Sequence, residues 1–450
     1  MRTSVRCIAL AGLMAGIATA CQSAPAPLPP PVMLPLADSA AAALIWAKGH
    51  AVGVSLDDSI PSGGETALLA TFATGASVIG VSELTEGTRE FAMGVRHVLF
   101  ALADSGGARG LAIQAPMAEA MEIDRFVRTG EGNPKRLLHA LGSWRWETPE
   151  MLSLVSAIRE WNRAHAPTKQ IGFYGFEIPS AAHAVDVVSS LPDSIAGAPL
   201  KAWLRREYGC VLTDEAARFG REGRMADSLF WRRCGVVANA TVDSIVALRA
   251  RSNPSRSARL ERVEQMARLV QHHVGVGLRY LSRQDANAEH VLYVARLLGP
   301  GATLIAWGGD VEMGRLTLDK TTVQTGQSLA DKLGQRYRAL AFMIGDGTVR
   351  ARPGTFNRSG QPADFTSVAV RPPLPMMYED VLSRVPLAAY WIDLRALPAD
   401  IAGGWLKGPR PARLITEVYA AGSSEAFQTP VEIPGFFDGL LFVRHVNATR

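Results

Sequence analysis

Residues 76–91 read ASVIGVSELTEGTREF, a short apolar run that is followed at once by a dense group of polar side chains. The apolar and β-branched residues 78–81 predict a buried strand that breaks at Ser82. The polar side chains that follow are Glu83, Thr85, Glu86, Thr88, Arg89 and Glu90. Open α/β sheets usually bind ligands at the carboxyl ends of their strands, so this stretch indicates a ligand site at a sheet edge. The alternative is a solvated strand-to-helix turn, with Thr85 as the cap of the helix.

The beginning of the chain is typical of export and anchoring. Arg2 and Arg6 precede an apolar run over residues 8–17, as in a bacterial export signal. Residues 18–21, Ala-Thr-Ala-Cys, predict a lipoprotein-processing site at which Cys21 becomes lipid-modified, with a plain signal peptide as the alternative. We therefore expect a lipoprotein signal peptide over residues 1–21 and a Pro/Ala-rich tether over residues 22–37. The folded part, residues 38–450, is expected on the periplasmic side of a bacterial envelope or at the outer membrane.

The composition of the chain is that of a globular protein, with 48% apolar and 20% charged residues. The net charge of +5 is modest, and the arginines of residues 205–268 are mixed with acidic residues. This mixture predicts a solvated helical face, so we expect no nucleic-acid partner. The only membrane contact that we expect is the lipid anchor.

Two cysteines, Cys210 and Cys234, lie in the expected folded part. An even pair in an oxidising compartment predicts a disulfide. Two separately buried thiols are the alternative. Neither cysteine has a histidine near it in the sequence, so neither is expected to be catalytic.

Strand and helix patterns alternate along much of the chain. Further strands are predicted at residues 111–115, 171–177 and 302–307, with helical periodicity between them. Residues 181–283 instead contain long amphipathic segments without a strand candidate. We therefore expect an α/β fold with a central, mostly parallel sheet flanked by helices, and a helical insertion at about residues 181–283.

Residues 79–91 resemble the signature of the erythromycin esterase family, Leu-Gly-Glu-Ala-Thr-His-Gly-Thr-Arg-Glu-Phe. Residues 171–177 and the segments that begin at Arg283 and at Ala302 are also similar to family patterns. The resemblance covers roughly residues 75–180 and 283–445. It implies the family's α/β fold and a histidine base beside acidic residues, which activates water against an ester or lactone.

The chain departs from the family at the residues that carry this chemistry. The family's histidines fall on Glu86, Gly309 and Glu312, and a family glutamate falls on Gln114. Because histidine is the side chain that most readily serves as a base at neutral pH, we do not expect macrolide esterase activity. The resemblance implies instead one acidic cleft, with Arg283 at its edge, formed by Glu83, Glu86, Glu177, Asp310 and Glu312.

Closely packed carboxylates raise one another's pKa, so one can act as an acid while another acts as a base. We assign catalytic roles to Glu83, Glu86, Arg283 and Glu312. Substrate-binding roles are assigned to Thr85, Thr88, Arg89, Gln114, Glu177 and Trp307. The same cleft is also suited to a divalent cation such as Ca²⁺, Mg²⁺ or Mn²⁺, which prefers oxygen ligands. Its candidate ligands are Glu83, Glu86, Asp310 and Glu312.

These observations lead to an envelope-anchored hydrolase that acts on an ester or related bond of a small-molecule substrate. The sequence establishes no cofactor, and a divalent cation is one option. Two alternatives remain open. One is a surface lipoprotein that keeps the esterase fold and binds a ligand or metal without turnover. The other is a structural lipoprotein that uses the helical insertion to contact a partner.

Overall fold

The computed structural model describes residues 35–57, 61–105, 107–192, 195, 197–207, 228–316, 318, 323–354 and 363–450. The expected signal peptide, the lipidation site Cys21 and almost all of the tether lie outside the described residues. Cys210 lies outside them as well, whereas Cys234 is buried in a helix of the insertion. The disulfide therefore stays a prediction. No helix in the described part of the chain is long and apolar enough to cross a membrane.

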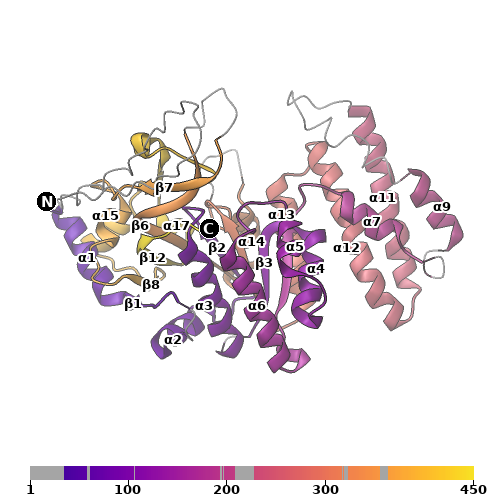
Figure 1. The fold of residues 1–450 in the computed structure, drawn as a ribbon, viewed down its shortest axis with the longest axis horizontal. Coiled ribbons are helices and arrows are strands. Elements are labelled where there is room, and N and C mark those ends of the chain that lie inside the picture. The colour runs from indigo at the N-terminus through magenta and orange to yellow at the C-terminus, as the bar shows by residue number, and fades with distance from the viewer. Residues whose placement is uncertain are drawn as a thin grey trace, which may run out of the picture. The chain divides into compact units, whose positions relative to one another are not determined.

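A large mixed sheet forms the centre of the fold (Figure 1). Its strands in spatial order are β1 (Val52–Gly53), β8 (Ala389–Asp393), β12 (Gly439–Val446), β6 (Tyr337–Pro353), β2 (Val78–Glu83), β5 (Thr303–Gly309), β3 (Ala108–Pro116) and β4 (Gly172–Glu177). The strands from β12 to β4 are parallel to their neighbours, and β1 and β8 pair antiparallel. Two further strands, β7 (Thr366–Val370) and β10 (Val418–Tyr419), pair with β6, while β9 (Arg410–Arg413) and β11 (Gln428–Val431) form a separate two-stranded antiparallel sheet. The prediction of a mostly parallel central sheet is confirmed.

The quoted stretch forms β2, which lies between β6 and β5 and is buried on both faces. Val78 packs into one apolar layer, and Ile79 and Val81 pack into the other, as the period of two in a strand requires. Parallel strands covered on both faces are nearly continuous apolar runs, which is why residues 78–81 carry so little polarity.

Helices cover both faces of the sheet. One apolar layer is covered by α2 (Gly63–Ala73), α3 (Arg89–Ser105) and α6 (Pro149–Ala164). The opposite layer includes α1 (Asp38–His50), α13 (Arg283–Leu298), α14 (Thr325–Leu333), α15 (Tyr378–Leu382) and α16 (Ile401–Lys407). The shorter helices α5 (Pro134–His139) and α17 (Ile433–Phe436) complete the set, and α4 (Met117–Thr129) contributes residues to both layers.

Most of the described residues between 181 and 283 lie in helices, and the helical insertion at about residues 181–283 stays a prediction. These helices are α7 (Ala182–Ser189), α9 (Ala198–Glu207), α11 (Ser228–Ala250) and α12 (Pro254–Gly277). The long helices α11 and α12 pack side by side (Figure 1), and α12 also packs on α7 and α13. The insertion is thereby joined to the helix that precedes β5.

The expected capping role of Thr85 is wrong. Helix α3 begins at Arg89, four positions after Thr85. Thr85 instead pairs through a β-bridge with Ile415 and is 1% exposed. The turn between β2 and α3 contains Gly87, whose φ is +79°. Only glycine fits there, because a Cβ would lie 2.3 Å from the carbonyl oxygen of Arg350.

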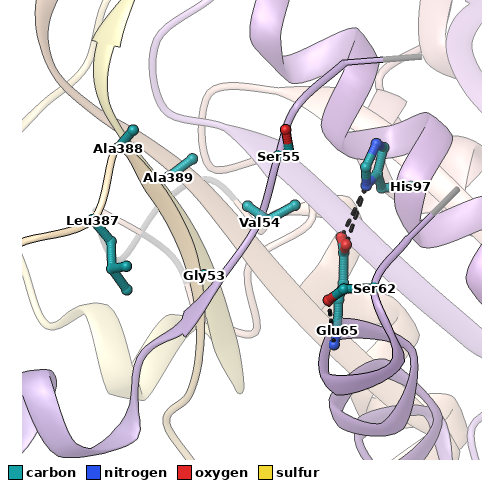
Figure 2. A pocket seen from close by; sticks show the side chains of 9 residues that line it. All are labelled: Gly53, Val54, Ser55, Ser62, Glu65, His97, Leu387, Ala388 and Ala389. Carbon is teal, nitrogen blue, oxygen red and sulfur yellow. Dashed lines mark hydrogen bonds and ion pairs between the residues drawn. The ribbon is translucent and has the colours of Figure 1, made fainter. Parts of the chain in front are cut away.

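A buried ion pair ties α2 and α3 to the antiparallel edge of the sheet. Figure 2 shows His97 and Glu65 facing each other beside a cavity of about 380 Å³. His97 Nδ1 lies 3.0 Å from Glu65 Oε1, and Nε2 lies 3.1 Å from the carbonyl oxygen of Asp57. Trp391 of β8 donates to the same carboxylate at 2.8 Å. A carboxylate and a carbonyl only accept, so both imidazole nitrogens donate and His97 is a cation.

This ion pair predicts a pH dependence of stability. The hydrogen bonds to Glu65 and Asp57 outweigh the opposing effect of burial and raise the pKa of His97 above its usual 6.5. The stabilisation is therefore complete below pH 6.5 and is lost as the pH rises through the higher folded-state pKa. We expect His97→Leu to cost about 3–5 kcal/mol at pH 6, because Glu65 is left buried without its counter-charge. Denaturant unfolding measured between pH 5.5 and 9 tests both statements.

The matched control is His139→Leu, which removes an exposed histidine from a comparable contact with Glu147 at 2.9 Å. Exposed ion pairs contribute about 0–1 kcal/mol, so this variant should unfold almost like the wild type. Equal losses in the two variants would contradict the assignment of His97.

Candidate functional site

Strand ends bring the acidic side chains together at one sheet edge. Glu83 is the last residue of β2 and pairs in register with Gly309, the last residue of β5. Glu177 ends β4 at the same edge. The connection from β2 leads to β3 on the far side of β5, and the connection from β5 leads to β6 on the far side of β2. The connection from β5 toward β6 and the connection from β3 toward β4 thus diverge between β5 and β3, where open α/β sheets form a crevice.

The guanidinium of Arg145 lies among these carboxyl groups. Its Nη2 is 3.7 Å from Glu83 Oε2, and its Nη1 is 3.4 Å from Glu86 Oε1. Nη1 also donates to Gln114 Oε1 at 3.1 Å, and the guanidinium stacks over Trp146 at 4.6 Å. The side chain is only 11% exposed. Sequence patterns gave no signal for Arg145, since it lies in the irregular segment between α5 and α6.

Glu83 is held as a neutral acid. It is 5% exposed, and burial raises the pKa of its carboxyl to about 8 against the lowering effect of Arg145, with a smaller rise from Glu86. Trp307 Nε1 donates to Glu83 Oε1 at 2.8 Å. The indole of Trp307 packs edge-on against Trp146 at 4.9 Å and is 3% exposed. In this structure Trp307 therefore positions Glu83.

Glu86 lies in the volume that a side chain at position 309 would need. A Cβ added to Gly309 would lie 1.7 Å from Glu86 Oε1 and 2.9 Å from Arg145 Nη1. Burial is the main cause of a raised pKa for Glu86, and Asp310, Glu417 and Glu177 add to it against Arg145. The absence of a side chain at position 309 is thus a condition for the contact between Glu86 and Arg145.

Gln114 connects the two sides of the site. Its Oε1 accepts from Arg145 and from the backbone N–H of Gly309 at 2.8 Å, and its Nε2 donates to Glu177 Oε1 at 3.1 Å. Burial raises the pKa of Glu177, while Gln114 and Arg283 lower it. Because an amide has a donor at one end and an acceptor at the other, Gln114 fixes an arginine and a carboxyl group at once.

Glu312 and Asp310 extend the acidic group beyond β5. Burial raises the pKa of Glu312 to about 7, with contributions from Glu177 and Asp310, and Thr325 donates a hydrogen bond to its Oε1. Asn287 also lowers this pKa by hydrogen bonding. Asp310 has a φ of +49°, its pKa is raised mainly by burial, and its Oδ1 has no hydrogen-bond partner in the described structure.

The remaining assigned residues lie at the margin of the site or away from it. Arg283 is exposed at the first position of α13, where its charge lowers the pKa of Glu177. Arg89 is exposed and lines a different cavity of about 290 Å³. Thr88 is 6% exposed and lines a small cavity beside Glu83. Their proposed roles stay predictions, and Arg145 is the guanidinium that contacts the carboxyl groups.

A histidine near the site is not available as a base. His290 Nδ1 donates to the carbonyl oxygen of Phe176 at 2.9 Å, and His290 Nε2 lies 3.0 Å from His272 Nδ1. Burial is the main cause that lowers the pKa of His290 to about 3, so it is neutral and both nitrogens are engaged. His290 therefore offers no free nitrogen to this edge.

Within the described residues, no group of three or more His, Cys, Asp or Glu side chains is placed to hold a metal ion. Arg145 already lies between Glu83 and Glu86 as their counter-charge. The geometry of these two carboxyl groups gives the cation alternative no support.

The chain is similar to a known protein family and to several solved structures. Residues 105–446 match a family model described as erythromycin esterase. A Bacillus cereus protein has a TM-score of 0.76 at 18% identity, covering 91% of this chain and 98% of its own. A succinoglycan biosynthesis protein gives 0.74 at 15% identity, with 91% and 97% covered. A mutant of the erythromycin esterase EreC in its open conformation gives 0.61 at 14% identity, with 89% and 98% covered. At these identities the structural likeness establishes the fold.

The close packing of Glu86 against Gly309 predicts that a methyl group added at position 309 displaces the Glu86 side chain. Gly309→Ala should displace the Glu86 carboxylate from Arg145, because the new Cβ would overlap it. We expect a loss of about 1–3 kcal/mol in the free energy of unfolding, the usual cost of overpacking. Chemical denaturation and a crystal structure of the variant measure the two effects.

Gly308→Ala is the matched control. A Cβ at Gly308 would meet its nearest neighbours, Gln114 Oε1 and Glu312 Cβ, at 3.4 Å, which is ordinary contact. This variant should keep Glu86 in place. An unchanged Glu86 in Gly309→Ala would show that the two positions are not coupled.

The charge of Arg145 makes a separate prediction about titration. Arg145 lowers the pKa values of Glu83 and Glu86, so Arg145→Gln should raise the pKa of Glu83 above 8 and raise that of Glu86 as well. Carbon-13 NMR of labelled glutamate carboxyls over a pH series measures both. Arg283→Gln is the control, since Arg283 acts on Glu177 and should leave Glu83 unchanged. An equal change in the pKa of Glu83 in both variants would contradict the specific effect of Arg145 on Glu83.

Proposed function

The chain belongs to the erythromycin esterase family, and we propose that it is a hydrolase that cleaves an ester or related bond of a small-molecule substrate with buried carboxyl groups. The observation that carries this proposal is the placement of Glu83 and Glu86 within 4 Å of the same guanidinium, that of Arg145. Burial raises the pKa of both carboxyl groups, and the charge of Arg145 lowers it in both. Such a pair supplies an acid and a base within one site.

Glu83 serves as the general acid in this proposal. With a pKa of about 8 it keeps its proton at neutral pH, and Trp307 fixes its orientation. Glu86 serves as the general base, since a carboxylate whose pKa is raised by burial is a stronger base than an exposed one. Arg145 holds the negative charge of Glu86 and supplies positive charge beside the developing oxyanion.

The reaction follows from these roles. Glu86 takes a proton from water as the water oxygen bonds to the ester carbonyl carbon. The bond to the leaving alcohol oxygen then breaks, and that oxygen takes the proton of Glu83. The products are a carboxylic acid and an alcohol, and exchange of protons with solvent restores the two glutamates. Macrolides are not the proposed substrates, because the positions that the resemblance assigns to histidine hold Glu86, Gly309 and Glu312.

We place this activity at the bacterial envelope. The support is the export and lipidation pattern of residues 1–21 and the tether that follows, which precede a folded part of ample size.

One observation favours a non-catalytic alternative. The cavity that touches Glu83 has a volume of about 20 Å³, which is too small for an ester substrate without movement of the surrounding side chains. A protein that retains the family fold and binds a ligand at the rim of the acidic group fits this observation.

Turnover of a panel of aryl esters and lactones by the purified full chain tests the proposal. We expect Glu83→Gln and Glu86→Gln to lower kcat/KM by about 10²–10⁴, the usual contribution of a general acid or base. The wild-type rate should fall as the pH rises above about 8, where Glu83 loses its proton, and the assay runs with and without divalent cations.

Glu147→Gln is the control, because Glu147 is an exposed glutamate outside the site. Equal rates in Glu83→Gln, Glu86→Gln and Glu147→Gln would refute the assigned roles. An inactive wild type whose melting temperature rises with added ester would establish the binding alternative instead.

A further inference from the structure

A small cavity lies beside Glu83 and is lined in part by residues of α3 and α6. Its volume is about 20 Å³. A buried water molecule needs roughly 10–15 Å³, so the cavity has room for one water. Its lining residues are Glu83, Gly87, Thr88, Ala92, Arg145, Trp146, Thr148, Met151, Trp307 and Thr449.

Two polar atoms of this lining have no hydrogen-bond partner within the described structure. They are Thr88 Oγ1 and Arg145 Nη2. Thr88 is 6% exposed, and the side chain of Arg145 is 11% exposed, so bulk water does not satisfy either group. Buried polar groups in folded proteins are almost always hydrogen-bonded, to protein or to an ordered water. A single group that both donates and accepts hydrogen bonds would satisfy the hydroxyl of Thr88 and the guanidinium N–H of Arg145.

Within the described part of the chain, the carboxyl group of Glu83 also lacks a hydrogen-bond partner for its proton. Its neutral form carries an O–H that needs an acceptor. Trp307 Nε1 and Arg145 Nη2, which lie 2.8 Å and 3.7 Å from its two oxygens, are both donors. Neither can accept that proton. The cavity is also lined by three threonine hydroxyls. Thr148 accepts from the backbone N–H of Met151 and Thr449 donates to Glu150, whereas Thr88 Oγ1 has no partner in the described structure.

We propose that one ordered water molecule occupies this cavity, where it donates to Thr88 Oγ1 and accepts hydrogen bonds from Arg145 Nη2 and from the protonated Glu83. Water fits because it supplies acceptors for two donors and a donor for the hydroxyl, within the available volume. The positive charge of Arg145 excludes a cation. The water is a structural part of the acidic site, since it joins Glu83, Arg145 and the turn that precedes α3.

The proposal does not depend on the hydrolase activity, because it concerns a hydrogen-bond partner of Glu83 in the resting protein. It assigns Thr88 a positioning role through the water. It also explains why a threonine precedes α3 at a place where its hydroxyl bonds to no other residue of the described structure.

A high-resolution crystal structure of the full chain, together with infrared spectra of the protonated carboxyl group, tests the proposal. We expect a water peak within hydrogen-bond distance of Thr88 Oγ1 and Arg145 Nη2. Thr88→Val keeps the shape of the side chain but removes the hydroxyl, so it should lose the peak and shift the C=O stretching band of Glu83. Glu83→Gln assigns that band by its disappearance.

Two matched variants separate this effect from a change in packing. Thr88→Ser restores the hydroxyl and should keep both the peak and the band. Thr85→Val alters a neighbouring buried threonine that does not line the cavity, and it should leave both unchanged. An empty cavity in the wild type, or a Thr88→Val variant that retains the peak and the band, would overturn the proposal. The wild-type and Thr88→Ser maps decide the question even if Thr88→Val does not fold.

Discussion

The acidic site depends on the contact of one guanidinium with two buried carboxyl groups. Glu83 and Glu86 are both less than 10% exposed, and burial alone would force both to be neutral. Arg145 lies within 4 Å of each of them and lowers the pKa of both. Removing one member of such a group leaves an uncompensated charge, so the three side chains form a single unit. The hydrogen bonds of Gln114 then extend this unit to β4 and β5.

The packing of Glu86 against Gly309 makes the departures from the family pattern interdependent. The resemblance assigns histidines to both positions, but the structure has room for only one side chain there. A glutamate at position 86 that reaches Arg145 requires a glycine at position 309. The residues at positions 86 and 309 therefore depend on each other. Burial of the carboxyl groups in this arrangement raises the pKa values of Glu83, Glu86 and Glu312.

The histidines that contact neighbouring elements show how the fold uses imidazole away from the acidic group. His97 is a cation because both of its partners accept, whereas His290 is neutral because burial opposes its charge. The first ties the helices to the sheet edge, and the second joins α13 to the end of β4 and to His272 of the insertion. Both are committed to tertiary contacts.

The sequence by itself determined the mostly parallel sheet and the position of Glu83 and Glu86 at the end of a strand. These features follow from local periodicity and from residues that are close in the chain. The tertiary structure decided which charge balances these two carboxyl groups. Arg145 comes from an irregular segment about 60 residues along the chain, and no periodicity predicts where such a segment folds back. It also decided that Glu86 fills the space above Gly309, because exclusion between two side chains depends on atomic positions that only the packed sheet fixes.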